Sequence, residues 1–263
     1  MIIDCCTFLN ELDLLEARLE YLNNHVDYFV VVESNYTFNG NEKPYHIKNN
    51  MDRFAKYGEK LIYVPIEVSI AGYDFTDLAA RNQWAMERQQ RNAMTLPLDR
   101  FDPNDVVIFG DIDEIPHRNA IATAADLVRK GERVIAFEQD FFYFNFDQVN
   151  QNKWPGTLIT TVQQLRAFTP QTFRDHRYSH PRIGNGGYHL SYWGSPRQIQ
   201  YKIDNFSHQE INKPEFNNVE NITQSIAEGK DLYNRPEEIW LRTDRTTLDP
   251  DMLQAFERLE YKV

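Results

Sequence analysis

The sequence predicts an α/β protein in which helices cover a mostly parallel sheet. Two apolar segments, residues 2–8 and 26–33, flank a helical pattern, and strand, helix and strand at this spacing form a βαβ unit. The segment at 26–33 (VDYFVVVE) is apolar almost throughout, as expected for a strand with both faces covered. A chain of 263 residues with 41% hydrophobic residues is long enough for one large domain with a sizeable core.

The helix between these two strands is predicted from the repeat of leucines. Leu12, Leu15, Leu19 and Leu22 recur at helical spacing, so one apolar stripe faces the sheet. Asn10 precedes the stripe and is the predicted N-cap, since a short polar side chain there accepts from free backbone N–H groups.

The remaining elements follow from shorter patterns. A long helix is expected from residue 74 to about 94, ended by Pro97, and residues 34–50 are expected to form a loop. We expect one main domain over 1–227 and a C-terminal helical extension over 228–263, packed on the same domain. Further strands are predicted at 61–68, 105–109, 133–137 and 157–162.

Composition excludes several classes of partner. The chain has 28 Lys and Arg against 39 Asp and Glu, a net charge of −11, which argues against binding nucleic acid or an anionic membrane surface. No apolar stretch is long enough for an integral membrane segment. The only cysteines, Cys5 and Cys6, are adjacent and would point to opposite faces of a strand, so no disulfide is expected. These features together predict a cytoplasmic protein.

An acidic turn follows the predicted strand at 105–109. Asp111, Asp113 and Glu114 lie where that strand ends, and ligands of open α/β sheets gather at the carboxyl ends of the strands. Carboxylates this close repel one another, and a divalent cation removes that penalty. Oxygen ligands favour Mg²⁺ or Mn²⁺, which could bridge the protein to a diphosphate. The simpler interpretation is a polar turn that merely ends a strand.

A second Asp-x-Asp pattern, Asp249-Pro250-Asp251, serves as a control. Its context predicts that Asp249 caps a helix and that Pro250 takes the first helical position. The pattern therefore gains meaning only from the strand before it.

Five segments of the sequence, taken in order, match a known pattern: 4–39, 87–92 (ERQQRN), 104–116 (NDVVIFGDIDEIP), 154–158 (WPGTL) and 186–196 (GGYHLSYWGSP). They resemble glycosyltransferase family 17, the family of the β-1,4-mannosyl-glycoprotein β-1,4-N-acetylglucosaminyltransferase. The resemblance covers roughly residues 3–210 and fades in the C-terminal fifty residues. Five ordered segments are more specific than any single one.

The resemblance implies a fold, a reaction and its partners. The fold would be the GT-A type, a Rossmann-like sheet covered by helices. The reaction would be metal-dependent, inverting transfer of a sugar, GlcNAc, from a UDP-sugar to a carbohydrate hydroxyl, giving a β-linkage. An alternative is a carbohydrate- or nucleotide-sugar-binding protein of the same fold without turnover. A nucleotidyl- or phosphoryl-transferring enzyme would also need acids on a metal, but no phosphate-binding GxxxxGK[ST] loop occurs in the sequence.

Three residues are the candidate metal ligands. Asp113 is expected to bind Mn²⁺ or Mg²⁺ directly, and Asp111 is expected to contact the metal through water or to contact the donor ribose. The resemblance to GT-A enzymes adds a late histidine, for which His189 is the candidate and His208 the alternative. The simpler interpretation of His189 is a loop histidine bonded to the backbone.

The donor nucleotide is expected to contact two groups of residues. Glu87 and Arg91 stand at i and i+4 on the predicted helix and form a stabilising surface pair in the simpler interpretation. In the functional interpretation Arg91 or Arg88 faces the diphosphate. The base and ribose would contact the ends of the first two strands, at Asn10, Glu11 and Glu33.

An inverting transferase also needs a general base for the acceptor hydroxyl. In GT-A enzymes this acid often lies between a glycine-containing loop and the late histidine. Asp175 is the only acid between Gly156 and His189. Asp140 and Glu138 are the rivals, Glu114 is a further candidate, and the sequence does not choose among them.

Overall fold

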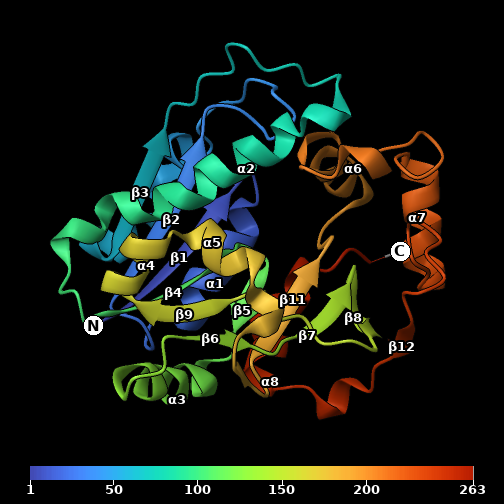
Figure 1. Cartoon of the computed structure of the whole chain (residues 1–263). Helices are drawn as coiled ribbons and strands as arrows, with labels where there is room; N and C mark the ends of the chain where they lie inside the picture. Colours follow the sequence, from blue (N-terminus) through green and yellow to red (C-terminus); the bar gives the residue numbers. More distant parts are fainter. Residues whose placement is uncertain (263) are drawn as a thin grey trace.

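A seven-stranded sheet lies at the centre of the molecule (Figure 1). The structure is a computed structural model and describes residues 1–262. The two pairings of β9 are antiparallel and all others are parallel, which confirms the predicted mostly parallel α/β sheet. In spatial order the strands are β10 (Arg182–Ile183), β6 (Val134–Phe137), β9 (Leu158–Thr161), β4 (Val106–Asp111), β1 (Ile2–Phe8), β2 (Tyr28–Ser34) and β3 (Leu61–Ile66).

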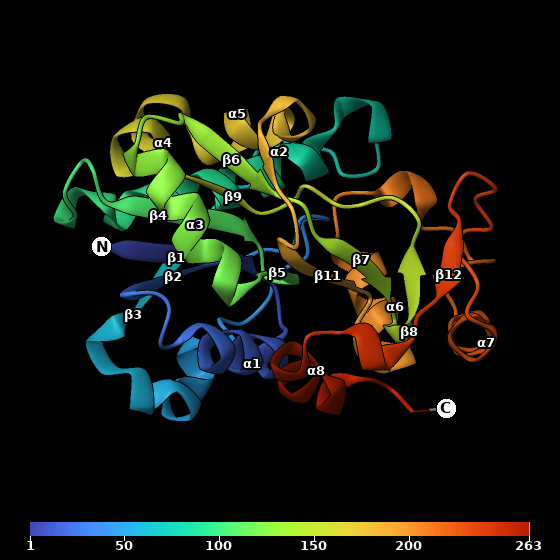
Figure 2. The same cartoon turned by 90° about the horizontal axis from the view of Figure 1, so that it is seen from below.

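Helices cover both faces of this sheet (Figure 2). On one side lie α1 (Leu12–Leu22), α3 (Arg118–Arg129) and α8 (Pro250–Phe256), and on the other lie α2 (Asn82–Asn92), α4 (Val162–Phe168) and α5 (Pro170–Asp175). Because neighbouring residues of a strand face opposite ways, Cys6 packs in the first core and Cys5 in the second. Both thiols are buried and free, as predicted.

A second sheet of five strands was not predicted from the sequence. Helices α6 (Pro196–Asn205) and α7 (Val219–Glu228) pack on it through a third, aromatic-rich core. The aromatic segment at 141–146 supplies two of its strands, and aromatic residues on both faces hide the alternation that would indicate a strand. In spatial order these strands are β12 (Trp240–Arg242), β8 (Asn145–Asn150), β7 (Asp140–Tyr143), β11 (Gly187–Ser191) and β5 (Glu114–Pro116).

Two local predictions were wrong. The helix expected at 74–94 begins only at Asn82, because Arg81 adopts a left-handed backbone (φ 53°) that interrupts it. Asn10 is not the N-cap of α1: Glu11 holds that position, and its carboxylate accepts from the N–H groups of Leu9 and Asn10. Short 3₁₀ segments span Lys48–Lys60, Leu78–Ala80, Ala93–Arg100, Arg177–Ser179, Gln209–Ile211, Arg245–Thr247 and Glu257–Leu259.

The C-terminal residues are helical only in part. Strand β12 pairs with β8 at the edge of the second sheet, and α8 packs against α1. Asp249 caps α8 by accepting from the N–H groups of Asp251 and Met252, as its sequence context predicts. Over residues 1–262, every helix is too short or too polar to cross a membrane.

Candidate active site

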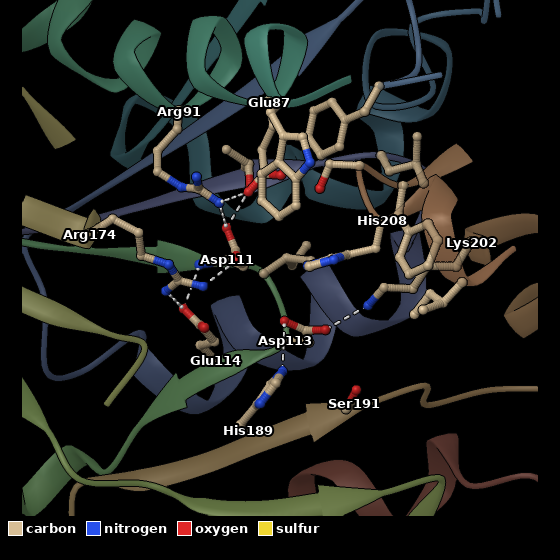
Figure 3. A pocket seen from close by; sticks show the side chains of 18 of the residues that line it. Glu87, Arg91, Asp111, Asp113, Glu114, Arg174, His189, Ser191, Lys202 and His208 are labelled. Atoms are coloured by element: carbon tan, nitrogen blue, oxygen red, sulfur yellow. Dashed lines mark hydrogen bonds and ion pairs between the residues drawn. The ribbon is translucent and has the colours of Figure 1, made fainter. Parts of the chain in front are cut away.

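A cavity of about 1040 Å³ opens at the carboxyl ends of β1 and β4. The second sheet forms its far wall through β7 and β11, and α2 and α6 border it. The predicted acidic turn lies inside this cavity, and Figure 3 shows its carboxylates meeting basic side chains from three helices. The cavity therefore lies at the edge of the sheet where the sequence predicts a ligand.

The backbone of the acidic turn is held from below by Arg18 of α1. This fully buried guanidinium pairs with Asp4 at 2.7 Å and donates to the carbonyl oxygens of Asp111, Ile112 and Glu114 at 2.8–3.2 Å. A rigid fork of donors suits this task, because it satisfies several acceptors at once. Arg18 therefore fixes the direction in which the turn presents its carboxylates.

Asp111, the last residue of β4, is bound by two arginines. Its Oδ1 accepts from Arg91 at 2.9 Å and from the Thr7 hydroxyl at 3.3 Å, and its Oδ2 accepts from Arg174 at 2.7 Å. Burial opposes ionisation, but Arg174 and Arg91 outweigh it and hold the pKa of Asp111 far below its usual range. Asp111 is thus a fixed anion paired with protein cations.

Glu114 belongs to the framework of the site. Its carboxylate accepts from Arg174 at 2.6 Å, from the Trp154 indole N–H at 2.6 Å and from the N–H of Asp111 at 2.9 Å. A Cβ at Gly156 would lie 2.1 Å from Glu114 Oε1, so glycine allows this close packing. All the acceptor capacity of Glu114 is therefore directed to the protein.

Asp113 lines the cavity from the end of the turn, directly before β5. Its Oδ2 lies 2.6 Å from Lys202 Nζ, and its Oδ1 lies 3.7 Å from His189 Nε2. Burial raises the pKa of Asp113, but Lys202 and His189 outweigh that effect and the pKa is lowered. The His189 ring stacks against both Phe141 and Trp154, at centroid distances of 4.7 and 4.8 Å, and these two rings also contact each other at 5.6 Å.

The position and the protonation state of the His189 imidazole both suit a metal ligand. Burial lowers its pKa, and Asp113 offsets this only in part, so the neutral form is favoured. Its Nδ1 is buried without a hydrogen-bond partner, and its Nε2 points at Asp113 (Figure 3). Asp113 and His189 together fit a divalent cation that takes its other ligands from a diphosphate and water.

Asp111, the third predicted metal ligand, makes its contacts with arginines instead of with Asp113 and His189. Asp111 is occupied by Arg91 and Arg174, and no group of three or more His, Cys, Asp or Glu residues within 1–262 could hold a metal ion. A cation here would depend on the substrate for much of its coordination.

Helix α2 brings its basic residues to the same cavity. Gln90 donates to the carbonyl oxygens of Phe8 and Val32, which anchors the helix across the ends of β1 and β2. Arg91 pairs with Glu87 at 2.5 Å, as predicted, and also reaches Asp111. Arg88 is exposed and lines the cavity.

Of the three residues expected to contact the base and ribose, only one lines the cavity. Glu11 lines the cavity and Asn10 is not among its lining residues. Glu33 does not lie where a nucleotide contact was expected. Its carboxylate is fully buried, pairs with Lys43 at 2.8 Å and accepts from the Tyr63 hydroxyl at 2.8 Å. Two backbone N–H groups, of His46 and Ile47, complete its acceptor sites. Glu33 secures the loop after β2 and does not face the cavity.

The candidate bases are divided as well. Asp175 is exposed, lines the cavity and accepts from Gln171 at 2.7 Å. Asp140 and Glu138 are not among the lining residues, and they pair with Lys153 and Arg182 outside the cavity. Glu238, from the C-terminal extension, also lines the cavity and was not predicted.

The alternative metal ligand, His208, lies elsewhere in the cavity wall. Its Nδ1 is 2.7 Å from Glu210, and its ring meets Trp84 edge-on at 4.5 Å. It is exposed and no ion pair links it to Asp113.

Several site residues carry no signal in the sequence. Arg18 and Lys202 sit on helices where a basic residue is ordinary, and Arg174 lies in a segment without periodicity. A wall of aromatic residues also lines the cavity, and through Trp154, which donates to Glu114, it adjoins the acidic turn. It comprises Phe141, Tyr143, Trp154, Tyr192 and Tyr233.

Comparison with known proteins gives sequence relatives over part of the chain. The β-1,4-mannosyl-glycoprotein 4-β-N-acetylglucosaminyltransferases of Rattus norvegicus and Homo sapiens are each 29% identical to this chain over 126 residues. These matches cover 46% of this chain and 22% of each relative.

Solved structures give weaker likenesses. Glucosyl-3-phosphoglycerate synthase from Mycobacterium tuberculosis, in complex with Mn²⁺, UDP-glucose and glycerol 3-phosphate, is 13% identical with a TM-score of 0.43, covering 88% of this chain and 81% of that one. 4-Diphosphocytidyl-2C-methyl-D-erythritol synthase from Anaerococcus prevotii is 10% identical with a TM-score of 0.40, covering 70% and 86%. Both scores are below 0.5, so neither likeness bears on the assignment.

The family assignment rests on a match along most of the chain. A sequence model described as glycosyltransferase family 17 matches residues 1–243, which include the acidic turn, His189, Lys202 and both sheets. The chain therefore belongs to glycosyltransferase family 17.

Proposed function

We propose that the chain transfers GlcNAc from UDP-GlcNAc to a carbohydrate hydroxyl, with inversion at the anomeric carbon and with Mn²⁺ or Mg²⁺ as cofactor. The family supports glycosyl transfer, and the sequence relatives, which are N-acetylglucosaminyltransferases, suggest the donor. The observation that carries the proposal is Asp113 facing His189 inside a cavity that also presents Arg91, Arg174 and Lys202.

The charged side of the cavity is suited to the donor diphosphate. Arg91, Arg174 and Lys202 converge on the acidic turn, and Arg88 adds an exposed guanidinium from α2. Arginine forks bind phosphate oxygens in pairs. A divalent cation on Asp113 and His189 would neutralise charge on the leaving diphosphate.

The aromatic side of the cavity is suited to the acceptor. Rings such as Tyr143 and Tyr233 present apolar faces, and Glu238 and Arg235 beside them can bind hydroxyl groups. A cavity of about 1040 Å³ is larger than a single small ligand needs, which leaves room for two substrates.

Asp175 is the proposed general base. Its carboxylate accepts the proton of the acceptor hydroxyl while that oxygen bonds to the anomeric carbon of the donor. The bond from that carbon to the diphosphate breaks, and its electron pair leaves with UDP. Asp175 lines the cavity, and its carboxylate accepts a hydrogen bond from the neutral side chain of Gln171.

The two free, buried cysteines fit a reducing compartment, and we propose a cytoplasmic location on that basis.

A panel of nucleotide sugars tests the proposal. Each donor is incubated with the protein and Mn²⁺, and released nucleotide and binding are both measured. We expect UDP-GlcNAc to be hydrolysed or transferred, with no signal in EDTA. Binding of UDP-GlcNAc without turnover on any carbohydrate acceptor would favour the alternative of a sugar-nucleotide-binding protein. A preference for a different nucleotide would overturn the assigned donor.

A further inference from the structure

Lys202 of α6 holds the carboxylate on which the proposed cation depends. Its ammonium lies 2.6 Å from Asp113 Oδ2, on the side of the carboxylate away from His189 (Figure 3). The side chain retains 28% exposure to the cavity, and its Nζ also lies 5.8 Å from the Tyr192 ring. Lys202 is therefore a cation in contact with the ligand Asp113 and with the space where a substrate would lie.

An ammonium on Asp113 opposes the arrival of a divalent cation. Two cations a few ångströms apart repel each other, and the repulsion is stronger where water is partly excluded. Lysine has a flexible stem of four carbons, so its charge can move without displacing the helix. The side chains of Arg91 and Arg174, by contrast, are only 3% and 9% exposed, and each donates to several acceptors.

The charge count shows where the ammonium would go. Four carboxylates, Glu87, Asp111, Asp113 and Glu114, meet three cations, Arg91, Arg174 and Lys202, so this group has a net charge of 3 − 4 = −1. A diphosphate adds at least two negative charges, and a divalent cation adds two positive ones. Once Asp113 binds the cation, the anions that remain for Lys202 are the Glu11 carboxylate, which also lines the cavity, and the phosphate oxygens of the donor, which carry the larger charge.

We propose that Lys202 is a movable cation: it neutralises Asp113 when no metal is bound and transfers to the donor diphosphate when a divalent cation takes Asp113. Lys202 then weakens binding of the metal alone and strengthens binding of the nucleotide in the presence of metal. The second half rests on the proposed function. A lysine that only stabilised the fold would not affect the two affinities in opposite directions.

The test uses Lys202→Met, which keeps the length of the side chain and removes its charge. Lys202→Arg keeps the charge, and Lys230→Met, at an exposed lysine paired with Glu228, is the matched control. Binding of Mn²⁺ alone is followed from the paramagnetic resonance signal of free Mn²⁺, and binding of UDP at saturating Mn²⁺ by calorimetry. A thermal melt of each variant checks that it is folded.

Opposite changes in the two affinities are expected. Lys202→Met should bind Mn²⁺ alone several-fold more tightly, and UDP with Mn²⁺ about tenfold more weakly, the size of one lost charged hydrogen bond. Lys202→Arg should have affinities for Mn²⁺ and for UDP closer to those of the unmodified protein. Lys230→Met should have the same two affinities as the unmodified protein.

Unchanged or weaker Mn²⁺ binding in folded Lys202→Met would overturn the proposal, as would unchanged UDP binding. Failure of the unmodified protein to bind UDP with any metal would instead refute the proposed function. In that case the Mn²⁺ measurement still decides whether Lys202 competes for Asp113.

Discussion

Arg174 lies 2.7 Å from Asp111 and, through its other terminal nitrogen, 2.6 Å from Glu114. One guanidinium from α5 thus joins two carboxylates of the acidic turn, and a third bond to the carbonyl of Gly156 ties it to the chain before β9. Arg174 therefore neutralises Glu114 and shares the neutralisation of Asp111 with Arg91.

Replacing Arg174 should destabilise the fold strongly. Arg174→Met leaves Glu114 buried without its cation, and breaking such a pair costs about 3 kcal/mol or more. Urea denaturation measures the loss. Arg166→Met is the control, because Arg166 pairs with Asp99 at the surface and exposed pairs contribute little. Equal losses in the two variants would show that the buried pairing is not stabilising.

Asp113→Asn should abolish metal-dependent UDP binding and turnover while the protein stays folded. The amide keeps the shape of the side chain and removes the charge that a cation needs. Calorimetry with UDP and Mn²⁺, together with an assay of donor turnover, checks this. Asp251→Asn, in the other Asp-x-Asp pattern, should keep both properties because Asp251 lies on α8 outside the cavity. Full turnover in Asp113→Asn would refute the assignment of Asp113 as a metal ligand.

Asp175→Asn should lower kcat and leave donor affinity nearly unchanged, since a base acts in the chemical step. A loss of about 10²-fold or more is expected for a general base. Asp140→Asn and Glu138→Gln should behave like the unmodified enzyme, because neither residue lines the cavity. Glu238→Gln is the informative rival, and if it alone shows the loss, the base belongs to the C-terminal extension.

Glu33→Gln should lower stability without changing the affinity for UDP. The substitution leaves Lys43 buried beside a neutral amide, at a cost of about 3 kcal/mol. The free energy of unfolding and the UDP affinity are measured below the melting temperature of the variant. A selective loss of UDP affinity with normal stability would restore the original expectation that Glu33 contacts the nucleotide.

Stability should fall as the pH is lowered from 7.5 to 5.5. Burial lowers the pKa of His25, His46 and His180 in the folded protein. Around pH 6.5 the unfolded chain therefore binds more protons than the folded one, so stability is lost as pH falls through that value. Urea midpoints across this range test the direction. His180→Gln should reduce the slope, because it removes one of the three groups whose pKa is lowered in the folded protein.

How far the fold could be predicted depended on whether each element forms a recognisable apolar pattern. The strands of the seven-stranded sheet with four or more residues lie in apolar runs, and the runs indicated them within a few residues. The second sheet escaped prediction because its strands do not form continuous aliphatic runs, and aromatic residues such as Phe141 and Phe142 occupy both faces. The left-handed residue Arg81 likewise ends a helical pattern without any glycine or proline to mark it.

The sequence by itself determined the βαβ beginning, the acidic turn after a buried strand and the family. These depend on neighbours within one element or on ordered motifs, which a linear chain displays directly. Tertiary structure alone decided what each carboxylate meets. The partners of Asp111 and Asp113 are Arg174 and Lys202, 63 and 89 residues away, and packing sets such distances. For the same reason Glu33, at the end of a strand like Asp111, is closed off by Lys43 while Asp113 remains open to the cavity.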